Sequence, residues 1–372
     1  MAANRHEPNR RMASGLTLHA SVHSPGARPG DPAPYAGSDS FTFVHLRVQD
    51  ADGWTGNGFT GRFLAPEVAG FLNRAVAEAL ADTNTDPVSD LTRTYNPRGM
   101  TGVFVSAMSA LEIALTDLNA KRAGVSVAAL LGGKRRAAPV HVTCGFPALD
   151  TDELVHICAQ QVMSGAKGVK VLVAARDRSI AADVTRLRAV RAAIGDKADL
   201  IADANCGMDA ETASEFATAT ADLNLAWLEE PVRGNDRHAL AHLAAKTIVP
   251  LGAGQMEQSA ERFHLLAEAG VSVLQPNAVF AGGFGPAVKI ARNAVGHGCK
   301  VSPGGGWDII NLHWMCGAMD EGAVELHLAQ TRIARLLMPD LPFVSNGHLH
   351  VPEAPGLGLD PDDDALEDCR VF

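Results

Sequence analysis

Between about residue 136 and about residue 330, short β-branched runs alternate with longer, alanine-rich stretches of helical periodicity. The strand candidates in this region are VHVTCGF, GVKVLVA, DLIADAN, AWLEEPV, VPLGAGQ, VSVLQPNAV, CKVSPGG and AVELHLA. Strands that alternate with helices form a parallel sheet, because each return to a parallel neighbour needs a crossover connection. Eight such strands are the number that closes a TIM-type barrel, so the sequence predicts an α/β barrel over residues 136–330.

A different pattern precedes the barrel. Apolar and polar residues alternate in FTFVHLRV, DADGW supplies a turn and GNGF resumes a strand, which predicts a hairpin. Residues 65–81 and 103–123 have apolar positions at helical spacing. We therefore expect residues 1–135 to form a separate α+β domain. The Pro- and Gly-rich stretch around Tyr35 is either a linker or a lid over a pocket.

Charge and cysteine usage exclude several classes of protein. The chain has 42 acidic and 32 basic residues, and no basic stripe reverses this balance, so a nucleic acid is not an expected partner. No apolar run approaches the roughly 18 residues of a membrane span. The six cysteines form no C-x-x-C pair, and the N-terminus lacks the apolar region of a secretory signal. We expect reduced thiols in a cytoplasmic protein.

Polar side chains stand where three successive strands end. Asp203, Glu229 and Gln255 are about 26 residues apart, the length of one strand–helix unit. In a TIM-type barrel the chemistry lies at the carboxyl ends of the strands, where these side chains would meet. Two carboxylates and an amide oxygen are hard donors that suit Mg²⁺. Any one of the acids could instead cap the following helix or pair with an arginine, but three in this register predict a magnesium site.

The strand endings IADAN, WLEEPV, VPLGAGQ and QPNAVFAGGF, with AMSALEIALTDLNAKRAGVSVAALLGG before them and PGLGL after them, support a more specific interpretation. The chain resembles the enolase superfamily, in its mandelate racemase and muconate lactonizing enzyme branch. The resemblance implies an α+β capping domain on a (β/α)₇β barrel, with a C-terminal segment, residues 331–372, that returns to the cap. It also implies that Mg²⁺ stabilises an enediolate formed when the α-proton of a carboxylate is removed.

The resemblance assigns roles to particular residues. Metal ligands are implied at Asp203, Glu229 and the position of Gln255, where the family usually has an acid. Lys170 matches the first lysine of a K-x-K motif, but Leu172 replaces the second, which is usually the α-proton base. Residues i and i+2 share one face of a strand, so we predict that Lys170 faces the metal pocket.

The other customary base, a histidine oriented by an aspartate, is replaced by Gly304 and Asn277. Glu325 matches a position that can hydrogen-bond the substrate carboxylate, and Asn205 matches a polar residue beside the metal. The substrate-binding candidates are thus Asn205, Asn277 and Tyr35, and the catalytic candidates are Lys170 and Glu325.

Several alternatives remain open from the sequence. Lys170 either acts as the base, with a pKa lowered by burial and a nearby cation, or hydrogen-bonds the substrate carboxylate. Glu230 or Glu257 could supply the charge that Gln255 lacks. His141 and Asp308 either reach the pocket or are structural.

Two functional hypotheses follow. The first is a metal-assisted lyase or isomerase, similar to an acid-sugar dehydratase, that abstracts the α-proton of a sugar acid and has no two-base racemase activity. The alternative is a catalytically degenerate barrel that serves as a small-molecule binding or regulatory protein. We expect a homo-oligomer in either case.

Overall fold

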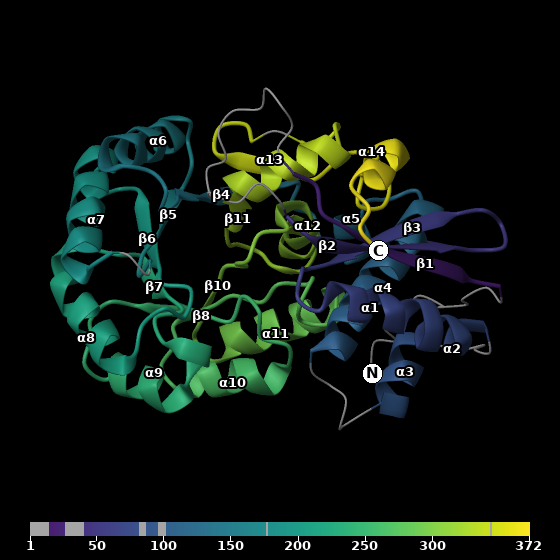
Figure 1. Ribbon diagram of the computed structural model, residues 1–372, viewed down its shortest axis with the longest axis horizontal. Helices are drawn as coiled ribbons and strands as arrows, with labels where there is room; N and C mark the ends of the chain where they lie inside the picture. The colour runs from purple at the N-terminus through teal and green to yellow at the C-terminus, as the bar shows by residue number, and fades with distance from the viewer. Residues whose placement is uncertain (1–14, 27–40, 82–86, 96–101, 176–177, 343) are drawn as a thin grey trace, which may run out of the picture.

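The computed structural model describes residues 15–26, 41–81, 87–95, 102–175, 178–342 and 344–372 (Figure 1). The substrate-binding candidate Tyr35 lies outside the described residues.

The larger part of the molecule is the barrel. Its strands are β4 (Ala137–Gly145), β5 (Gly168–Leu172), β6 (Asp199–Asp203), β7 (Trp227–Glu229), β8 (Leu251–Ala253), β9 (Val273–Leu274), β10 (Lys300–Val301) and β11 (Val324–His327). They are parallel and pair in sequence order from β4 to β10, and β11 pairs with β4. Within the described residues no strand pairing joins β10 to β11, so the ring curls but is open there by hydrogen bonding. The predicted TIM-type architecture is confirmed.

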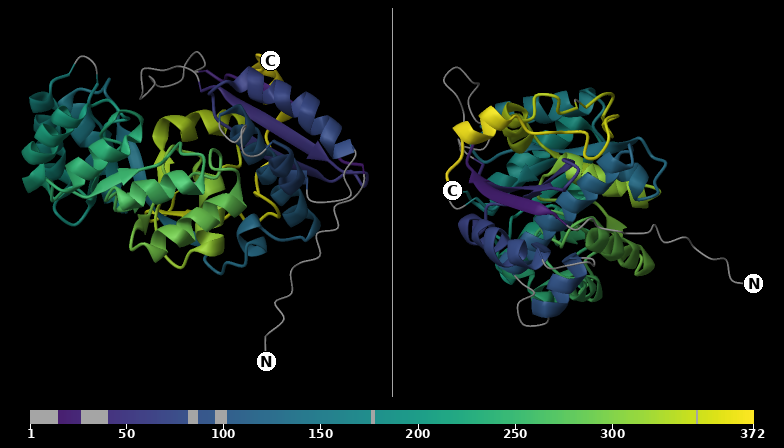
Figure 2. Two further views of the ribbon diagram at one scale, coloured as in Figure 1. Left: turned by 90° about the horizontal axis from the view of Figure 1, so that it is seen from below. Right: turned by 90° about the vertical axis from the view of Figure 1, so that its right-hand side faces the viewer.

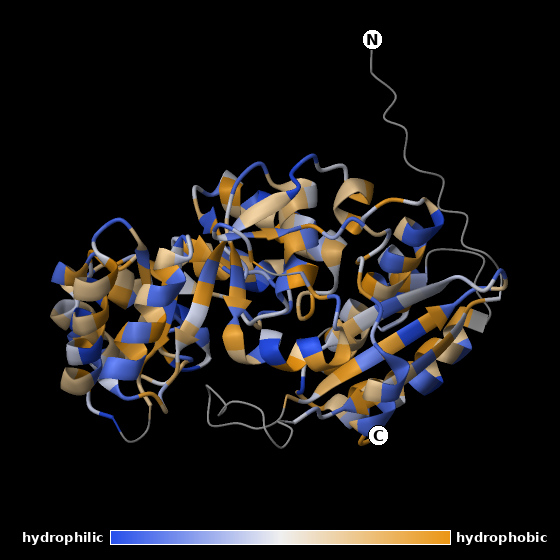
Figure 3. Cartoon of the chain, turned by 90° about the horizontal axis from the view of Figure 1, so that it is seen from above, coloured by the Kyte–Doolittle hydropathy of each residue, from blue (hydrophilic) through white to orange (hydrophobic). Residues whose placement is uncertain are grey.

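Seven helices connect the eight barrel strands and surround them on the outside (Figure 1). They are α6 (Thr151–Met163), α7 (Ile180–Ile194), α8 (Ala210–Ala219), α9 (Arg237–Ala244), α10 (Ala260–Glu268), α11 (Phe284–Gly296) and α12 (Asp308–Ala318). Sequence signals fix several starts: Asp150 and Glu153 form a capping box on α6, and the Ser179 hydroxyl caps α7. Hydrophobic and hydrophilic residues are interspersed around these helices, as expected for elements with one face on a core (Figure 3).

The N-terminal part forms the cap. Its antiparallel strands are β1 (Thr17–His23), β2 (Phe43–Gln49) and β3 (Thr55–Thr60), and its helices are α1 (Ala65–Phe71), α2 (Ala77–Ala81), α3 (Pro87–Tyr95), α4 (Val103–Arg122) and α5 (Val127–Leu130). A π-helical turn, Leu72–Val76, joins α1 to α2, so the helix expected over 65–81 is irregular in its middle. Helix α4 is long and apolar enough to span a membrane, but most of it is buried in the protein, which is also typical of a core helix.

The C-terminal segment follows β11 and contains α13 (Leu328–Leu337), β12 (His348–His350) and α14 (Asp363–Asp368), so its first helix begins before the expected boundary at residue 331. It lies between the barrel and the cap and ends beside β1 (Figures 1 and 2). One contact with the cap is made by the buried carboxylate of Asp117 on α4, which accepts hydrogen bonds from Leu357 N at 2.7 Å and from Asn57 N on β3 at 2.8 Å. The segment after the barrel therefore contacts the cap directly.

The cap also packs on the barrel rim. Trp307, at the start of α12, contacts Phe41, Phe43 and Phe59 of the cap, with ring centroids 5.6 to 6.0 Å apart. Glu112 of α4 accepts hydrogen bonds from backbone N–H groups in the first turn of α11. These contacts fix the cap over the carboxyl ends of the strands.

Candidate active site

A cavity of about 240 Å³ lies between the cap and the carboxyl ends of the barrel strands. We call it the central cavity. Its wall on the cap side includes Phe41, Arg62 and Phe63. Its polar barrel residues are Thr143, Asp203, Asn205, Gln255, Glu325, His327 and Gln330. Such a cavity over the ends of parallel strands is the usual place of an active site in this architecture.

Lys170 lies among three carboxylates next to this cavity. Its ammonium nitrogen is 2.5 Å from Glu229 Oε1, 3.1 Å from Glu325 Oε1 and 3.7 Å from Asp203 Oδ2. The lysine side chain is 2% exposed, and the three acids are buried with it. Strands β5, β6, β7 and β11 thus bring four charged groups to one point, and Lys170 faces the barrel interior as the sequence predicted.

The charges around Lys170 determine its pKa. Burial by itself lowers its pKa, but the attraction of Glu229, Glu325 and Asp203 outweighs burial and raises the pKa above its usual value. The three carboxylates favour the protonated form of Lys170, which can donate a hydrogen bond to a substrate carboxylate. The lowered pKa that we expect depends on a nearby cation, whose charge would oppose those carboxylates, so both roles of Lys170 stay predictions.

Glu325 is an ionised carboxylate, and both of its oxygen atoms accept hydrogen bonds from other barrel residues. Oε1 accepts from the Thr143 hydroxyl and from Lys170, and Oε2 accepts from Gly306 N at 2.9 Å. Burial would raise its pKa, but Lys170, then His327, and then the hydrogen bonds from Thr143 and Gly306 lower the pKa to about 2. Glu325 can therefore accept a hydrogen bond at neutral pH but cannot donate one.

The three predicted metal ligands stand on adjacent strands. Strand pairing places Asp203 opposite Glu229, and Gln255 follows the end of β8. Asp203 and Gln255 line the central cavity. The second oxygen of Glu229 accepts a hydrogen bond from Trp227 Nε1 at 2.9 Å. Among the described residues no three His, Cys, Asp or Glu side chains form a group that could hold a metal ion. The third predicted ligand, Gln255, is an amide and lies outside these residue types.

Glu230 orients that amide. Its carboxylate accepts from Gln255 Nε2 at 2.8 Å and from Asn235 Nδ2 at 3.0 Å. Gln255 Nε2 also lies 3.5 Å from Asn205 Oδ1. With the nitrogen of Gln255 held in this way, its oxygen is the atom left for a cation. Oxygen atoms of Asp203, Glu229 and Gln255 make a donor set of the kind that Mg²⁺ prefers, with one negative charge fewer than three acids would give.

The two customary base positions are filled differently. Leu172 lines the central cavity and offers no proton acceptor. A Cβ atom on Gly304 would lie 2.9 Å from Gln275 Nε2 and 3.2 Å from the Cβ of Gln255. Two glutamines therefore crowd the space next to Gly304, and a histidine there would need them to move.

The structure does not bring Asn277 into the central cavity. Its side chain is fully buried, and its amide nitrogen donates to the carbonyls of Gly304 at 2.7 Å and Gly306 at 3.3 Å, while its oxygen accepts from Val279 N. An aspartate could not donate to those carbonyls. Asn277 therefore holds the glycine loop, whereas Asn205 lies in the cavity wall.

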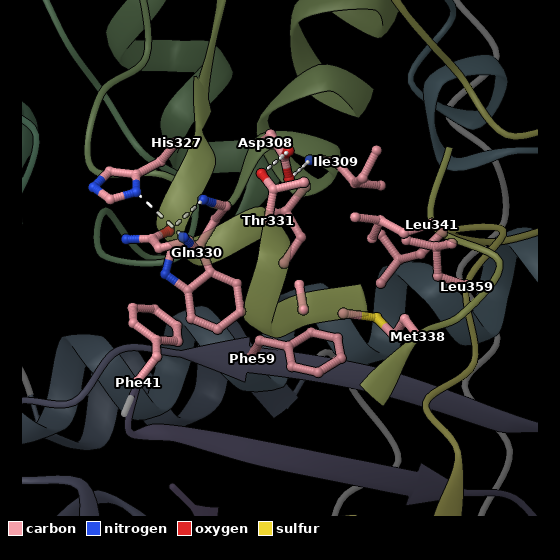
Figure 4. Close-up of a pocket in the computed structure, with 14 residues that line it drawn as sticks. Phe41, Phe59, Asp308, Ile309, His327, Gln330, Thr331, Met338, Leu341 and Leu359 are labelled. Atoms are coloured by element: carbon pink, nitrogen blue, oxygen red, sulfur yellow. Dashed lines mark hydrogen bonds between the residues drawn. The ribbon is translucent and has the colours of Figure 1, made fainter. Parts of the chain in front are cut away.

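Three further polar candidates lie elsewhere. His141 pairs with Asp199 at 2.9 Å, at the start of β6 and away from the cavity. Glu257 makes a two-point ion pair with Arg262. Asp308 lies in a smaller, mainly apolar pocket beside the central cavity, where it accepts hydrogen bonds from Ile309 N and from Thr331 (Figure 4).

One cavity residue, His327, is absent from the sequence-based assignment. It is the last residue of β11 and follows Glu325 by two positions, so strand alternation places both on the same face. It lines both the central cavity and the smaller pocket. The i, i+2 spacing in VELH was the signal that could have identified it.

The cap, the barrel and the buried charges at the strand ends together define an α/β-barrel enzyme. Two family models match the chain: "Mandelate racemase / muconate lactonizing enzyme, N-terminal domain" over residues 32–132 and "Enolase C-terminal domain-like" over residues 153–365. The chain therefore belongs to the enolase superfamily, in its mandelate racemase and muconate lactonizing enzyme branch.

Individual relatives agree with this assignment. The chain is 33% identical to L-talarate/galactarate dehydratase of Salmonella typhimurium over 70% of this chain and 67% of that one. It is 28% identical to arabinonate dehydratase of Saccharolobus solfataricus over 73% and 74% of the two chains. A structure of L-talarate dehydratase from a Polaromonas species, complexed with Mg and L-glucarate, superposes with a TM-score of 0.83 at 27% identity and covers 96% of this chain and 98% of that one. The chain is thus similar to lyases, and the alternative of a degenerate binding protein is not favoured.

Proposed function

We propose that this enzyme removes the α-proton of a sugar acid and then eliminates water or rearranges the ring, as a metal-assisted lyase or isomerase. The observation that carries the proposal is the buried group of Lys170, Asp203, Glu229 and Glu325 at the strand ends, next to the central cavity. Relatives named as dehydratases of galactarate and arabinonate support the substrate class.

Asp203, Glu229 and Gln255 are the residues that would hold Mg²⁺. When bound, the ion would polarise the substrate carboxylate and stabilise the charge that develops as the α-proton leaves. Lys170 would receive the α-proton, because burial and the charge of an ion held by Asp203 and Glu229 would favour its neutral form. Once protonated, it would donate hydrogen bonds to the substrate carboxylate, and Asn205 would contact a neighbouring substrate oxygen. Glu325 would keep Lys170 in place through its ion pair.

The base positions limit the reaction type. A racemase that uses two bases needs one on each side of the α-carbon, and here Leu172 and Gly304 stand at the two customary positions. We therefore propose a reaction without inversion at the α-carbon, such as elimination of water or cycloisomerisation.

The first prediction tests this proposal directly. The protein is incubated with Mg²⁺ and galactarate, arabinonate, galactonate or rhamnonate in deuterium oxide, and the α-proton is followed by NMR. We expect exchange or loss of water with at least one acid, and no inverted product. Exchange with inversion would contradict the reaction type, and no reaction with any of the four acids would favour a binding protein.

The cellular compartment and the oligomeric state of the enzyme are a further part of the proposal. The six cysteines are free, and Cys144 and Cys158 are buried with their sulfur atoms 3.7 Å apart. Unpaired thiols so close together suit the reducing cytoplasm. We propose a cytoplasmic homo-oligomer that acts on small carboxylates and not on nucleic acid.

A further inference from the structure

His327 lies beside Glu325, which is ionised and therefore cannot itself donate a hydrogen bond to a substrate carboxylate. It shares the wall of the central cavity with Glu325 and Thr143, and its side chain is half-buried. Strand β11 lies across the barrel from β7, which carries the metal-ligand candidate Glu229. A substrate that reaches from the metal ligands across the cavity would therefore meet Glu325 and His327 on the far wall.

One ring nitrogen of His327 has a fixed role. The backbone N–H of Gln330 donates a hydrogen bond to Nδ1 at 3.3 Å, and in this way His327 caps α13 (Figure 4). A backbone N–H can only donate, so Nδ1 presents its lone pair and the single proton of the neutral ring must lie on Nε2. Burial is the main cause that lowers the pKa of His327, and it outweighs the nearby Glu325 and a contact with the residue's own backbone, which raise the pKa. The lowered pKa agrees with a neutral ring.

The other ring nitrogen is available to a ligand. In Figure 4 it points away from Gln330. Among the described residues none forms a hydrogen bond with Nε2. A half-buried N–H without a protein partner on a cavity wall is a donor that a bound molecule can use.

A donor on this wall would complement Glu325. The ionised Glu325 can only accept hydrogen bonds, and it already accepts from Lys170, Thr143 and Gly306. A substrate carboxylate next to Glu325 would meet a like charge unless other groups donate to it, and a substrate hydroxyl that donates to Glu325 could itself accept a hydrogen bond from a neighbouring donor.

We propose that His327 is a substrate-binding residue that donates its Nε2–H to an oxygen of the carboxylate substrate beside Glu325. This inference rests on the proposed function, because it assumes that a sugar acid occupies the central cavity. A ring whose Nδ1 already accepts a hydrogen bond cannot take a second proton without losing that bond, so His327 acts as a neutral donor and not as the α-proton base.

Two variants of His327 test the roles of its two ring nitrogens separately. His327→Asn retains an acceptor near the Nδ1 position and so can still cap α13, since asparagine is a favourable N-cap residue, but it has no group at Nε2. His327→Gln places an amide nitrogen near the Nε2 position. The probes are galactarate, arabinonate, galactonate and rhamnonate with Mg²⁺, measured by titration calorimetry. For an acid that binds wild type, we expect about ten- to a hundredfold weaker binding by His327→Asn and nearly unchanged binding by His327→Gln.

A second measurement does not depend on turnover or on the choice of acid. Nitrogen NMR of isotope-labelled histidine reports the ring tautomer, and the spectrum of His327→Asn identifies the signal of His327. A neutral ring with its proton on Nε2 at pH 7 supports the proposal. A proton on Nδ1, a doubly protonated ring, or equal binding by His327→Asn and wild type would overturn it. If none of the four acids binds wild type, the proposed function is contradicted while the tautomer still decides whether His327 is a donor.

Discussion

At the scale of single residues, the amide of Gln255 has two opposite effects, one on hydrogen bonding and one on the charge of the proposed metal site. Its amide nitrogen donates to Glu230 at 2.8 Å, a contact that a glutamate could not make. The same amide leaves two carboxylates in the proposed metal-ligand set. In that proposed site, the hydrogen bond to the buried Glu230 is gained at the expense of one negative charge beside the ion.

We predict that Gln255→Glu binds Mg²⁺ at least about tenfold more tightly, because it adds a full negative charge beside the ion. Without metal, the new carboxylate would face Glu230, so the thermal unfolding temperature of the metal-free variant should fall. Titration calorimetry and unfolding curves with and without Mg²⁺ measure both effects. Gln330→Glu is the matched control, because it adds the same charge to another wall of the cavity. Equal Mg²⁺ affinities of Gln255→Glu and wild type would mean that residue 255 is not a ligand.

At the scale of secondary structure elements, buried charges connect strands that are far apart in the sequence. Lys170 of β5 contacts carboxylates from β6, β7 and β11, and Thr143 of β4 donates to the same Glu325 that Lys170 contacts. These contacts join β11 to β4 and β5 from inside the barrel, next to the place where the strand ring is open. The charge group therefore joins strands of the barrel, in addition to the role in the reaction that is proposed for it.

Acid should weaken this connection. The pKa of Glu325 is about 2 in the folded protein and about 4.3 in an unfolded chain, so its contribution is complete above pH 4.3 and is lost as the pH falls toward 2. The contribution is on the order of 3 kcal/mol of unfolding free energy. We predict that wild type loses more stability than Glu325→Gln between pH 5 and pH 2, as measured by urea unfolding at each pH. Parallel stability curves for the two proteins would contradict the assignment.

At the scale of the whole molecule, the cap and the C-terminal segment meet at Asp117. Its two carboxylate oxygens accept backbone N–H groups from β3 and from Leu357, and Lys121 lies 3.0 Å away. Leu357 belongs to the PGLGL sequence, so this motif serves to attach the C-terminal segment to the cap. The cap in turn closes the central cavity.

We predict that Asp117→Asn lowers the free energy of unfolding by about 1–3 kcal/mol, because an amide has one oxygen and would leave one buried N–H without an acceptor. Thermal and urea unfolding measure the change. Asp360→Asn is the control: Asp360 pairs with the same Lys121, but its side chain is 68% exposed, so the effect should stay below about 1 kcal/mol. A loss as large in Asp360→Asn would show that the buried carboxylate has no special role.

The sequence by itself was enough to predict the barrel, the cap and the positions of the polar residues at the strand ends. Period-2 and period-3.6 patterns are local properties, so eight strands, seven connecting helices and the hairpin at residues 43–60 could be read without a structure. The spacing of Asp203, Glu229 and Gln255 follows from the same repeat, because one strand–helix unit advances the chain by one position around the barrel. That Lys170 faces inward follows from strand alternation.

Only the tertiary structure decided how these groups are charged and what each one contacts. The raised pKa of Lys170 depends on carboxylates 33 to 155 residues away in the chain, and no local pattern contains that distance. Asn277 was expected in the cavity and instead holds the glycine loop, because hydrogen-bond partners are set by the packing of strand ends. The proposed donor role of His327 follows from the hydrogen bond between Gln330 N and its ring, and that contact is known only from the structure. Protonation and hydrogen bonding are properties of neighbours in space, and sequence spacing alone does not determine them.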